Sequence, residues 1–195
     1  LAIRSLCNTG VLLKNGEIIC NSSIDKVLEE YEKVTMKNIL KNSSGFFEFH
    51  KKFGMQSVRS FCDEKQTRVI KAGSKFTLEF SFTVKNDFFA PELGIGITNH
   101  KRESLMRFNN IHVGNEIKVK KGSGKISIII TDFPIYKPGD YYVTIYFGDI
   151  SSEYEIVEDA FSITVEEANV FNSNRLLEDK HNLLVHKSIE YKQTK

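Results

Sequence analysis

Phe76-Thr77-Leu78-Glu79-Phe80-Ser81-Phe82-Thr83-Val84 is the clearest structural signal in the chain. An apolar residue stands at every second position of this segment, which is the period of a β-strand with one buried face. The same alternation recurs at 93–98, 125–131, 141–148 and 161–166. Turn-forming residues separate these segments, and further strands are expected at 56–62, 105–108 and 117–120. These roughly eight short strands, with no helical segment between them, predict an all-β fold, an immunoglobulin-like or jelly-roll antiparallel β-sandwich.

The beginning of the chain has a different pattern. Asn15-Gly16 lies between the apolar segments 11–13 and 17–20. An Asn-Gly pair in such a position is a strong hairpin signal, because both residues tolerate a positive φ. Ser23 is a suitable N-cap for a helix that we expect to extend to Leu40. The sequence therefore predicts a short hairpin-plus-helix appendage before the sandwich.

Polar segments divide the chain into its expected parts. Residues 41–45 form a cluster of Lys, Asn, Ser and Gly of the kind that links domains. We therefore expect an appendage with its linker, a sandwich, and a C-terminal loop with a late strand, at 1–44, 45–167 and 168–195 respectively. The late strand, at Leu183-Leu184-Val185 and Ile189, could pair with its own sheet or be exchanged with a second copy in a dimer, and both readings stay open.

Composition and charge exclude several classes of protein. The 195 residues include 27 Lys and Arg against 25 Asp and Glu, a balance that makes a nucleic acid an unexpected partner. No apolar run approaches the roughly 20 residues needed to cross a bilayer. The three cysteines, Cys7, Cys20 and Cys62, are widely spaced, which favours neither disulfides nor a metal site and fits the reducing cytoplasm. Because the chain begins at Leu1, within an element already under way, we expect it to be part of a longer protein.

The usual catalytic motifs are missing from the sequence. It contains no GxxxxGK(S/T) loop for nucleotide phosphates, no HExxH metal motif and no GxSxG nucleophile motif. Its five histidines have no metal-ligand spacing among themselves or relative to the cysteines. We therefore expect no catalytic residue, no metal and no cofactor in this chain. A hydrolase with carboxylates from distant strands stays open, because such a pair leaves no local motif.

A candidate binding surface follows from the outward positions of the strands. Sugar-binding sheets present aromatic rings and short polar side chains on a face that small residues keep open, and arginines beside it can meet acidic or hydroxyl-rich ligands. The residues that fit lie on two strands that are neighbours in an immunoglobulin-like order, or on the hairpin that follows: Tyr142, Thr144, Tyr146, Gly94, Gly96, Thr98, His100, Arg102 and Arg107. The same pattern also fits an ordinary sheet surface, since Tyr and Thr favour strands and strand glycines often mark bulges.

The N-terminal segment resembles a known family. Leu6-Cys7 is followed by a hairpin with Leu13-Lys14-Asn15-Gly16-Glu17-Ile18 and by a helix with Val27-Leu28-Glu29-Glu30-Tyr31. This order resembles the end of an ABC-transporter ATPase domain, in which Leu-Cys, an L-x-x-G-x-I hairpin and a helix ending in V-(I/L)-x-x-Y follow one another. The match covers residues 3–31.

A β-sandwich after such a tail is similar to the C-terminal domain of the ATPase subunit of O-antigen polysaccharide exporters, the Wzt type. Ala72-Gly73, before the first strand quoted above, and Tyr136-Lys137-Pro138-Gly139-Asp140-Tyr141-Tyr142-Val143 resemble motifs of that domain. The resemblance implies that this part is not an enzyme, although the full-length protein would be an ABC ATPase. It implies a carbohydrate-binding domain that holds the O-antigen polysaccharide, at its non-reducing terminal region, for the exporter.

The resemblance also implies partners and a location. They are the transmembrane subunit of the exporter, a second copy in a homodimer, and the cytoplasm at the inner face of the bacterial inner membrane. The alternative function is a dimerisation or partner-recruitment module that does not bind glycan, because a free strand readily adds to another sheet.

Overall fold

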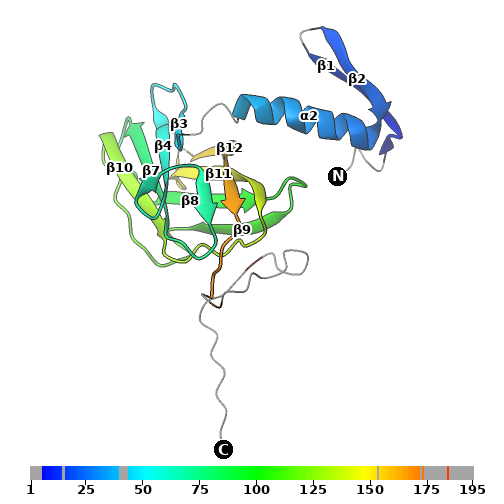
Figure 1. Cartoon of the computed structure of the whole chain (residues 1–195). Helices are drawn as coiled ribbons and strands as arrows, with labels where there is room; N and C mark the ends of the chain where they lie inside the picture. The colour runs from blue at the N-terminus through cyan, green and yellow to red at the C-terminus, as the bar shows by residue number, and fades with distance from the viewer. Residues whose placement is uncertain are drawn as a thin grey trace, which may run out of the picture. The chain divides into compact units, whose positions relative to one another are not determined.

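The computed structural model describes residues 6–14, 16–39, 44–152, 154–171, 173 and 184 (Figure 1). The chain divides into two compact units, Leu1–Lys41 and Asn42–Lys195, and each is described by itself. Within the described residues, no helix combines the length and the apolar character that crossing a membrane requires.

The N-terminal unit is a hairpin followed by a helix. Strand β1 (Thr9–Lys14) pairs antiparallel with β2 (Glu17–Ser23), and Gly16 occupies the turn with a φ of 86°, as the Asn-Gly pair predicts. Helix α2 (Ile24–Ile39) follows directly. Leu12 of β1 and Val27 of α2 are buried, so the helix packs against the hairpin. The predicted hairpin-plus-helix appendage is confirmed.

The second unit is a sandwich of two sheets. The first sheet has the order β10-β7-β4-β3, with β5 paired to β4, and its strands are β3 (Phe46–Glu48), β4 (Gly54–Cys62), β5 (Lys65–Gln66), β7 (Phe76–Val84) and β10 (Gly122–Ile130). The second sheet has the order β6-β12-β11-β8-β9, and its strands are β6 (Val69–Lys71), β8 (Pro91–Thr98), β9 (Ser104–Asn109), β11 (Gly139–Asp149) and β12 (Tyr154–Glu166). Neighbouring strands are antiparallel, except that β6 and β12 are parallel. The predicted antiparallel β-sandwich is therefore confirmed.

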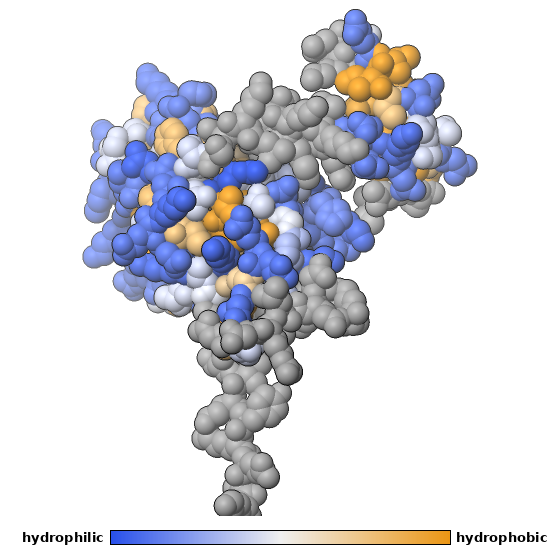
Figure 2. Space-filling view, viewed as in Figure 1, coloured by the Kyte–Doolittle hydropathy of each residue, from blue (hydrophilic) through white to orange (hydrophobic). Residues whose placement is uncertain are grey.

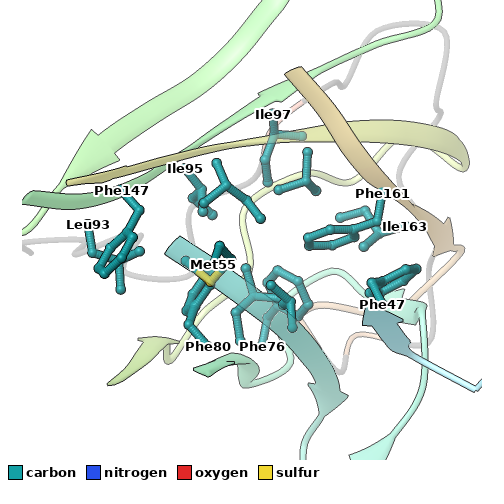
Figure 3. Packing of buried hydrophobic residues seen from close by; sticks show 14 of the residues in the cluster. Phe47, Met55, Phe76, Phe80, Leu93, Ile95, Ile97, Phe147, Phe161 and Ile163 are labelled. Atoms are coloured by element: carbon teal, nitrogen blue, oxygen red, sulfur yellow. The ribbon is translucent and has the colours of Figure 1, made fainter. Parts of the chain in front are cut away.

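The core lies between the two sheets and follows the alternation of the strands (Figure 3). In β7, the side chains of Phe76, Leu78 and Phe80 are fully buried, and the alternate side chains, Thr77 and Glu79, face away from the core. The Phe82 ring lies 5.1 Å from the Phe147 ring of β11, which joins the two sheets. Burying each such ring contributes about 1.5–3 kcal/mol. The face of the sandwich seen in Figure 2 is mostly hydrophilic, with a hydrophobic area near its middle.

Two segments differ from the predicted strands. Residues 117–120 form a loop, because their polar groups bond to the preceding loop in place of a strand ladder. The Asp87 carboxylate accepts hydrogen bonds from Lys120 Nζ and from the Lys121 backbone N–H at 2.9 and 2.8 Å. The last strand of the sandwich, expected at 161–166, begins earlier, at Tyr154.

The predicted late strand falls mostly outside the described residues, as Leu183, Val185 and Ile189 do. Leu184 is described, and it forms an isolated antiparallel bridge with Ile135. Ile135 is fully buried whereas Leu184 is half exposed. At this one point the C-terminal segment therefore lies beside the connection between β10 and β11.

Candidate ligand-binding face

The outer face of the second sheet holds most of the predicted site residues. On β11, the side chains that alternate with core residues project outward, and these are Tyr142, Thr144 and Tyr146. Their antiparallel partners on β8 are, in the same order, Thr98, Gly96 and Gly94. The predicted adjacency of the two strands is thus present in the structure. We call this surface, with the outward residues of β9 beside it, the β8–β11 face.

Arg102 reaches this face from the turn between β8 and β9. It has a φ of 62°, and the turn is held by the Asn99 side chain, whose oxygen accepts hydrogen bonds from the backbone of Lys101 and Glu103. The Arg102 guanidinium lies over the Tyr142 ring, 4.1 Å from its centre. It also forms an ion pair with the Asp159 carboxylate from β12. Arg102 is therefore held on the face by a cation–π contact with Tyr142 and an ion pair with Asp159.

Arg107 makes a second arginine–tyrosine pair. It stands on β9 opposite Gly96, and its guanidinium lies 4.2 Å from the centre of the Tyr146 ring. Arg107 is exposed, and the described part of the chain provides no carboxylate at ion-pair distance from it. Its charge is therefore open to a ligand, whereas the charge of Arg102 is already partly balanced.

The two tyrosines are not bare platforms, which changes the interpretation of the face. Tyr142 is 3% exposed, and Tyr146 is half-buried. Each ring is covered by a guanidinium, so a sugar ring would not meet the tyrosine first. The guanidinium groups of Arg102 and Arg107 lie over these rings and bring their N–H donors to the face.

Threonine hydroxyls lie between the two pairs. Thr144 Oγ1 accepts a hydrogen bond from the Asp159 backbone N–H at 3.3 Å, and Asp159 has a φ of 46°. Thr98 Oγ1 is buried, and no described residue bonds to it. A buried hydroxyl without a partner costs about 1–3 kcal/mol, and the Thr98 oxygen is closed to solvent, so Thr98 offers no contact to a ligand.

The two predicted glycines have different roles. A Cβ at Gly94 would lie 2.6 Å from the Phe108 carbonyl oxygen, so the close approach of β9 requires glycine there. A Cβ at Gly96 would lie 3.5 Å from the Tyr146 ring, which is an ordinary contact. Gly94 is therefore needed by the sheet, and Gly96 leaves room beside Tyr146.

His100, the remaining residue of the predicted site, lies outside the β8–β11 face. His100 is exposed in the turn before Arg102 and does not join the strand rows of the face. Among the described residues, no group of three or more His, Cys, Asp or Glu side chains is arranged to hold a metal ion.

Sequence reasoning missed a polar cluster at one end of the β8–β11 face. Glu92 Oε1 accepts hydrogen bonds from Asn109 Nδ2 at 2.6 Å and from the Tyr154 hydroxyl at 2.9 Å. Burial, together with the hydrogen bond to Glu92, raises the pKa of Tyr154 to about 12. Extending the alternation two residues from Gly94 and from Arg107 would have found Glu92 and Asn109. Tyr154 could not be found, because its strand was expected to begin at 161.

A cavity with a volume of about 710 Å³ lies elsewhere, between the segments 88–91 and 110–120. The Asn110 side chain, which lines it, bonds to the Leu93 N–H and to the Pro91 and Asn115 carbonyls. Its polar groups therefore hold the loop together, and we place the candidate site on the β8–β11 face.

The two stacked sheets define a β-sandwich domain, and the outer face of its second sheet carries two arginine–tyrosine pairs. The model of the Wzt C-terminal domain family matches residues 55–176, and the chain belongs to this family. Membership gives the domain a role in an O-antigen ABC exporter, which includes a transmembrane subunit, and makes it a non-catalytic domain.

The chain is similar in fold to a solved structure of the same family. The structure described as "Crystal structure of the C-terminal domain of wzt" is 12% identical, with a TM-score of 0.53, and the match covers 77% of this chain and 85% of that one. The soluble domain of PmoD from Methylocystis sp. is 12% identical, with a TM-score of 0.35, over 62% of this chain and 97% of that one. A β-glucosidase from Listeria innocua, in complex with gluconolactone, is 12% identical, with a TM-score of 0.34, over 61% of this chain and 17% of that one. No curated protein matches the chain.

Proposed function

We propose that the β8–β11 face binds the O-antigen polysaccharide, at its non-reducing terminal region, and delivers it to the exporter without changing it chemically. The observation that carries this proposal is the pair of arginine–tyrosine stacks on one sheet face. Arg102 and Arg107 each lie about 4 Å above a tyrosine ring. A guanidinium has five N–H donors in a rigid plane, and stacking leaves those at its edge free to meet sugar hydroxyls.

Ordering of the donors before binding supports this proposal. An arginine already held on a ring loses less conformational freedom when a ligand arrives. The face is nevertheless shallow, and its contacts with a glycan would be few and mediated in part by water. Useful affinity then depends on keeping the glycan near the domain at high effective concentration. In this proposal the domain works in the cytoplasm at the inner face of the bacterial inner membrane, beside the transmembrane subunit, and needs no cofactor.

The test is equilibrium binding of the O-polysaccharide of the producing cell, with an unrelated polysaccharide as the control ligand. Arg107→Ala should weaken binding at least tenfold, equivalent to about 1.4 kcal/mol, because it removes the donor without an ion pair. Tyr146→Ala should have a similar effect, since it removes the ring that holds this donor.

Arg59→Ala is the matched control. Arg59 also lies over an aromatic ring, 5.6 Å from the centre of Phe46, but on the first sheet. Its loss should leave binding unchanged. Equal binding by the wild type, Arg107→Ala and Tyr146→Ala would place the site elsewhere, and equal binding of both polysaccharides by the wild type would contradict specific recognition. Shortening of the glycan during incubation would indicate a hydrolase.

The alternative function, dimerisation or partner recruitment without glycan binding, has one observation in its favour. Leu184 pairs with Ile135, so the C-terminal segment can add to the edge of a structured element. We propose a homodimer in either case, and the two functions differ in whether the β8–β11 face binds glycan.

A further inference from the structure

Glu92 is a buried carboxylate without an ion pair. It is 9% exposed and lies on the β8–β11 face, two residues before Gly94. Its Oε1 accepts hydrogen bonds from the Asn109 amide and the Tyr154 hydroxyl. Neither donor carries a charge, and the ion pairs of the described residues do not include Glu92. A buried carboxylate normally has a cation beside it, so this arrangement calls for a function.

The second carboxylate oxygen of Glu92 is available to a ligand. No described residue donates a hydrogen bond to Oε2, whereas Oε1 has two donors. Oε2 is also not among the unpartnered side-chain atoms that are closed to solvent. Directly opposite Glu92 on β11 stands Gly148, which has no side chain to cover this oxygen. The carboxylate is thus fixed through one oxygen and open through the other.

The neighbours of Glu92 hold it in this position. The pKa of Tyr154 is raised to about 12, chiefly by burial and then by Glu92, so the phenol stays protonated at ordinary pH and keeps donating to the carboxylate. Arg107 lies over the Tyr146 ring, and Tyr146 stands opposite Gly94, two residues along β8 from Glu92. A fixed acceptor and an available donor therefore stand at the same end of the face.

We propose that Glu92 Oε2 and the Arg107 guanidinium together bind a vicinal diol of a neutral sugar in the glycan. One hydroxyl of the diol donates to the carboxylate, and its neighbour accepts from the guanidinium. The opposite charges of Glu92 and Arg107 balance each other at this point, which suits an uncharged sugar. This inference rests on the proposed glycan-binding function and specifies which sugar groups the face selects.

The first test replaces the charge of Glu92 and keeps its shape. Glu92→Gln should weaken binding of the producing cell's O-polysaccharide at least tenfold, because an amide offers a ligand hydroxyl a weaker acceptor than a carboxylate. Glu166→Gln is the matched control, since Glu166 is exposed at the far end of β12. It should bind as the wild type does. Thermal unfolding of each variant shows whether it is folded.

The second test needs no variant. Periodate cleaves vicinal diols, so the same polysaccharide, oxidised with periodate and reduced with borohydride, should lose its binding to the wild-type chain. Undiminished binding of the oxidised glycan, or of the intact glycan to a folded Glu92→Gln variant, would overturn the inference and leave the proposed function standing. Failure of the wild type to bind the intact glycan would overturn the proposed function itself.

Discussion

Asp149, the last residue of β11, organises the loop before β8. Its carboxylate accepts a hydrogen bond from the Ser151 hydroxyl at 2.6 Å and others from the backbone of Ser151, Phe89 and Ala90. These bonds, the Ser151 hydroxyl foremost, lower the pKa of Asp149 to about 2. One side chain thereby joins the end of one strand to the beginning of its neighbour, at the end of the sheet where Glu92 lies.

This pKa predicts how stability depends on pH. The folded-state pKa is about 2 against an ordinary value of 3.8, so the contribution of Asp149 is complete above about pH 4 and is lost as the pH falls through 2. Asp149→Asn should lower the thermal midpoint at pH 7 and flatten the loss of stability between pH 4 and 2. Glu116→Gln, in an exposed loop, is the control and should behave like the wild type. An Asp149→Asn profile parallel to that of the wild type would show that these bonds do not stabilise the fold.

At the scale of elements, the packing between neighbouring strands decides which strand glycines can be replaced without loss of stability. Gly124 of β10 lies over the Phe82 ring of β7, and a Cβ there would stand 2.5 Å from the ring. Gly96 of β8 has no such constraint, because its Cβ would make an ordinary contact. Gly124 and Gly96 both lie in strands, but only Gly96 should tolerate replacement by a residue with a Cβ.

Gly124→Ala and Gly96→Ala form a matched pair of variants. Gly124→Ala should destabilise the domain by about 1–3 kcal/mol, because the Phe82 ring is packed in the core and must shift. Gly96→Ala should change stability by less than about 1 kcal/mol. Urea denaturation monitored by tyrosine fluorescence measures both. Equal destabilisation by the two variants would mean that the packing of Phe82 yields to the added methyl group.

The elements also show how far the sequence could predict the structure. Alternation placed the strands and the outward side chains, because a period of two depends on local sequence alone. The same alternation wrongly predicted a strand at 117–120, where the structure has a loop. This loop is held by hydrogen bonds to Asp87, more than 30 residues away along the chain, so a local pattern could not reveal it. The bond between Glu92 and Tyr154 joins residues 62 positions apart, and the covering of Tyr142 depends on the positive φ of Arg102. Contacts of this kind follow from strand register and turn geometry, which the sequence pattern leaves open.

At the scale of the whole molecule, the domain belongs to the Wzt C-terminal domain family, with a role in an O-antigen ABC exporter, and the proposed glycan face occupies one sheet. The bridge between Leu184 and Ile135 involves the connection between β10 and β11, and neither residue belongs to the outward rows of β8 and β11. We therefore expect pairing of the C-terminal segment and binding of glycan to be separable, so that each can be removed without the other.

A chain that ends at Val170 tests this separation. It keeps every strand of the sandwich, since β12 ends at Glu166, and it lacks the segment that contains Leu184. We expect light scattering to give the mass of a dimer for the full chain and of a monomer for the shortened one. Glycan affinity per protomer, measured with a monovalent oligosaccharide, should be unchanged, because every residue of the β8–β11 face remains. An unchanged mass would exclude the C-terminal segment as the dimer contact. A monomer that has also lost its glycan affinity would contradict the separation, because the removed segment would then contribute to both dimer formation and glycan binding.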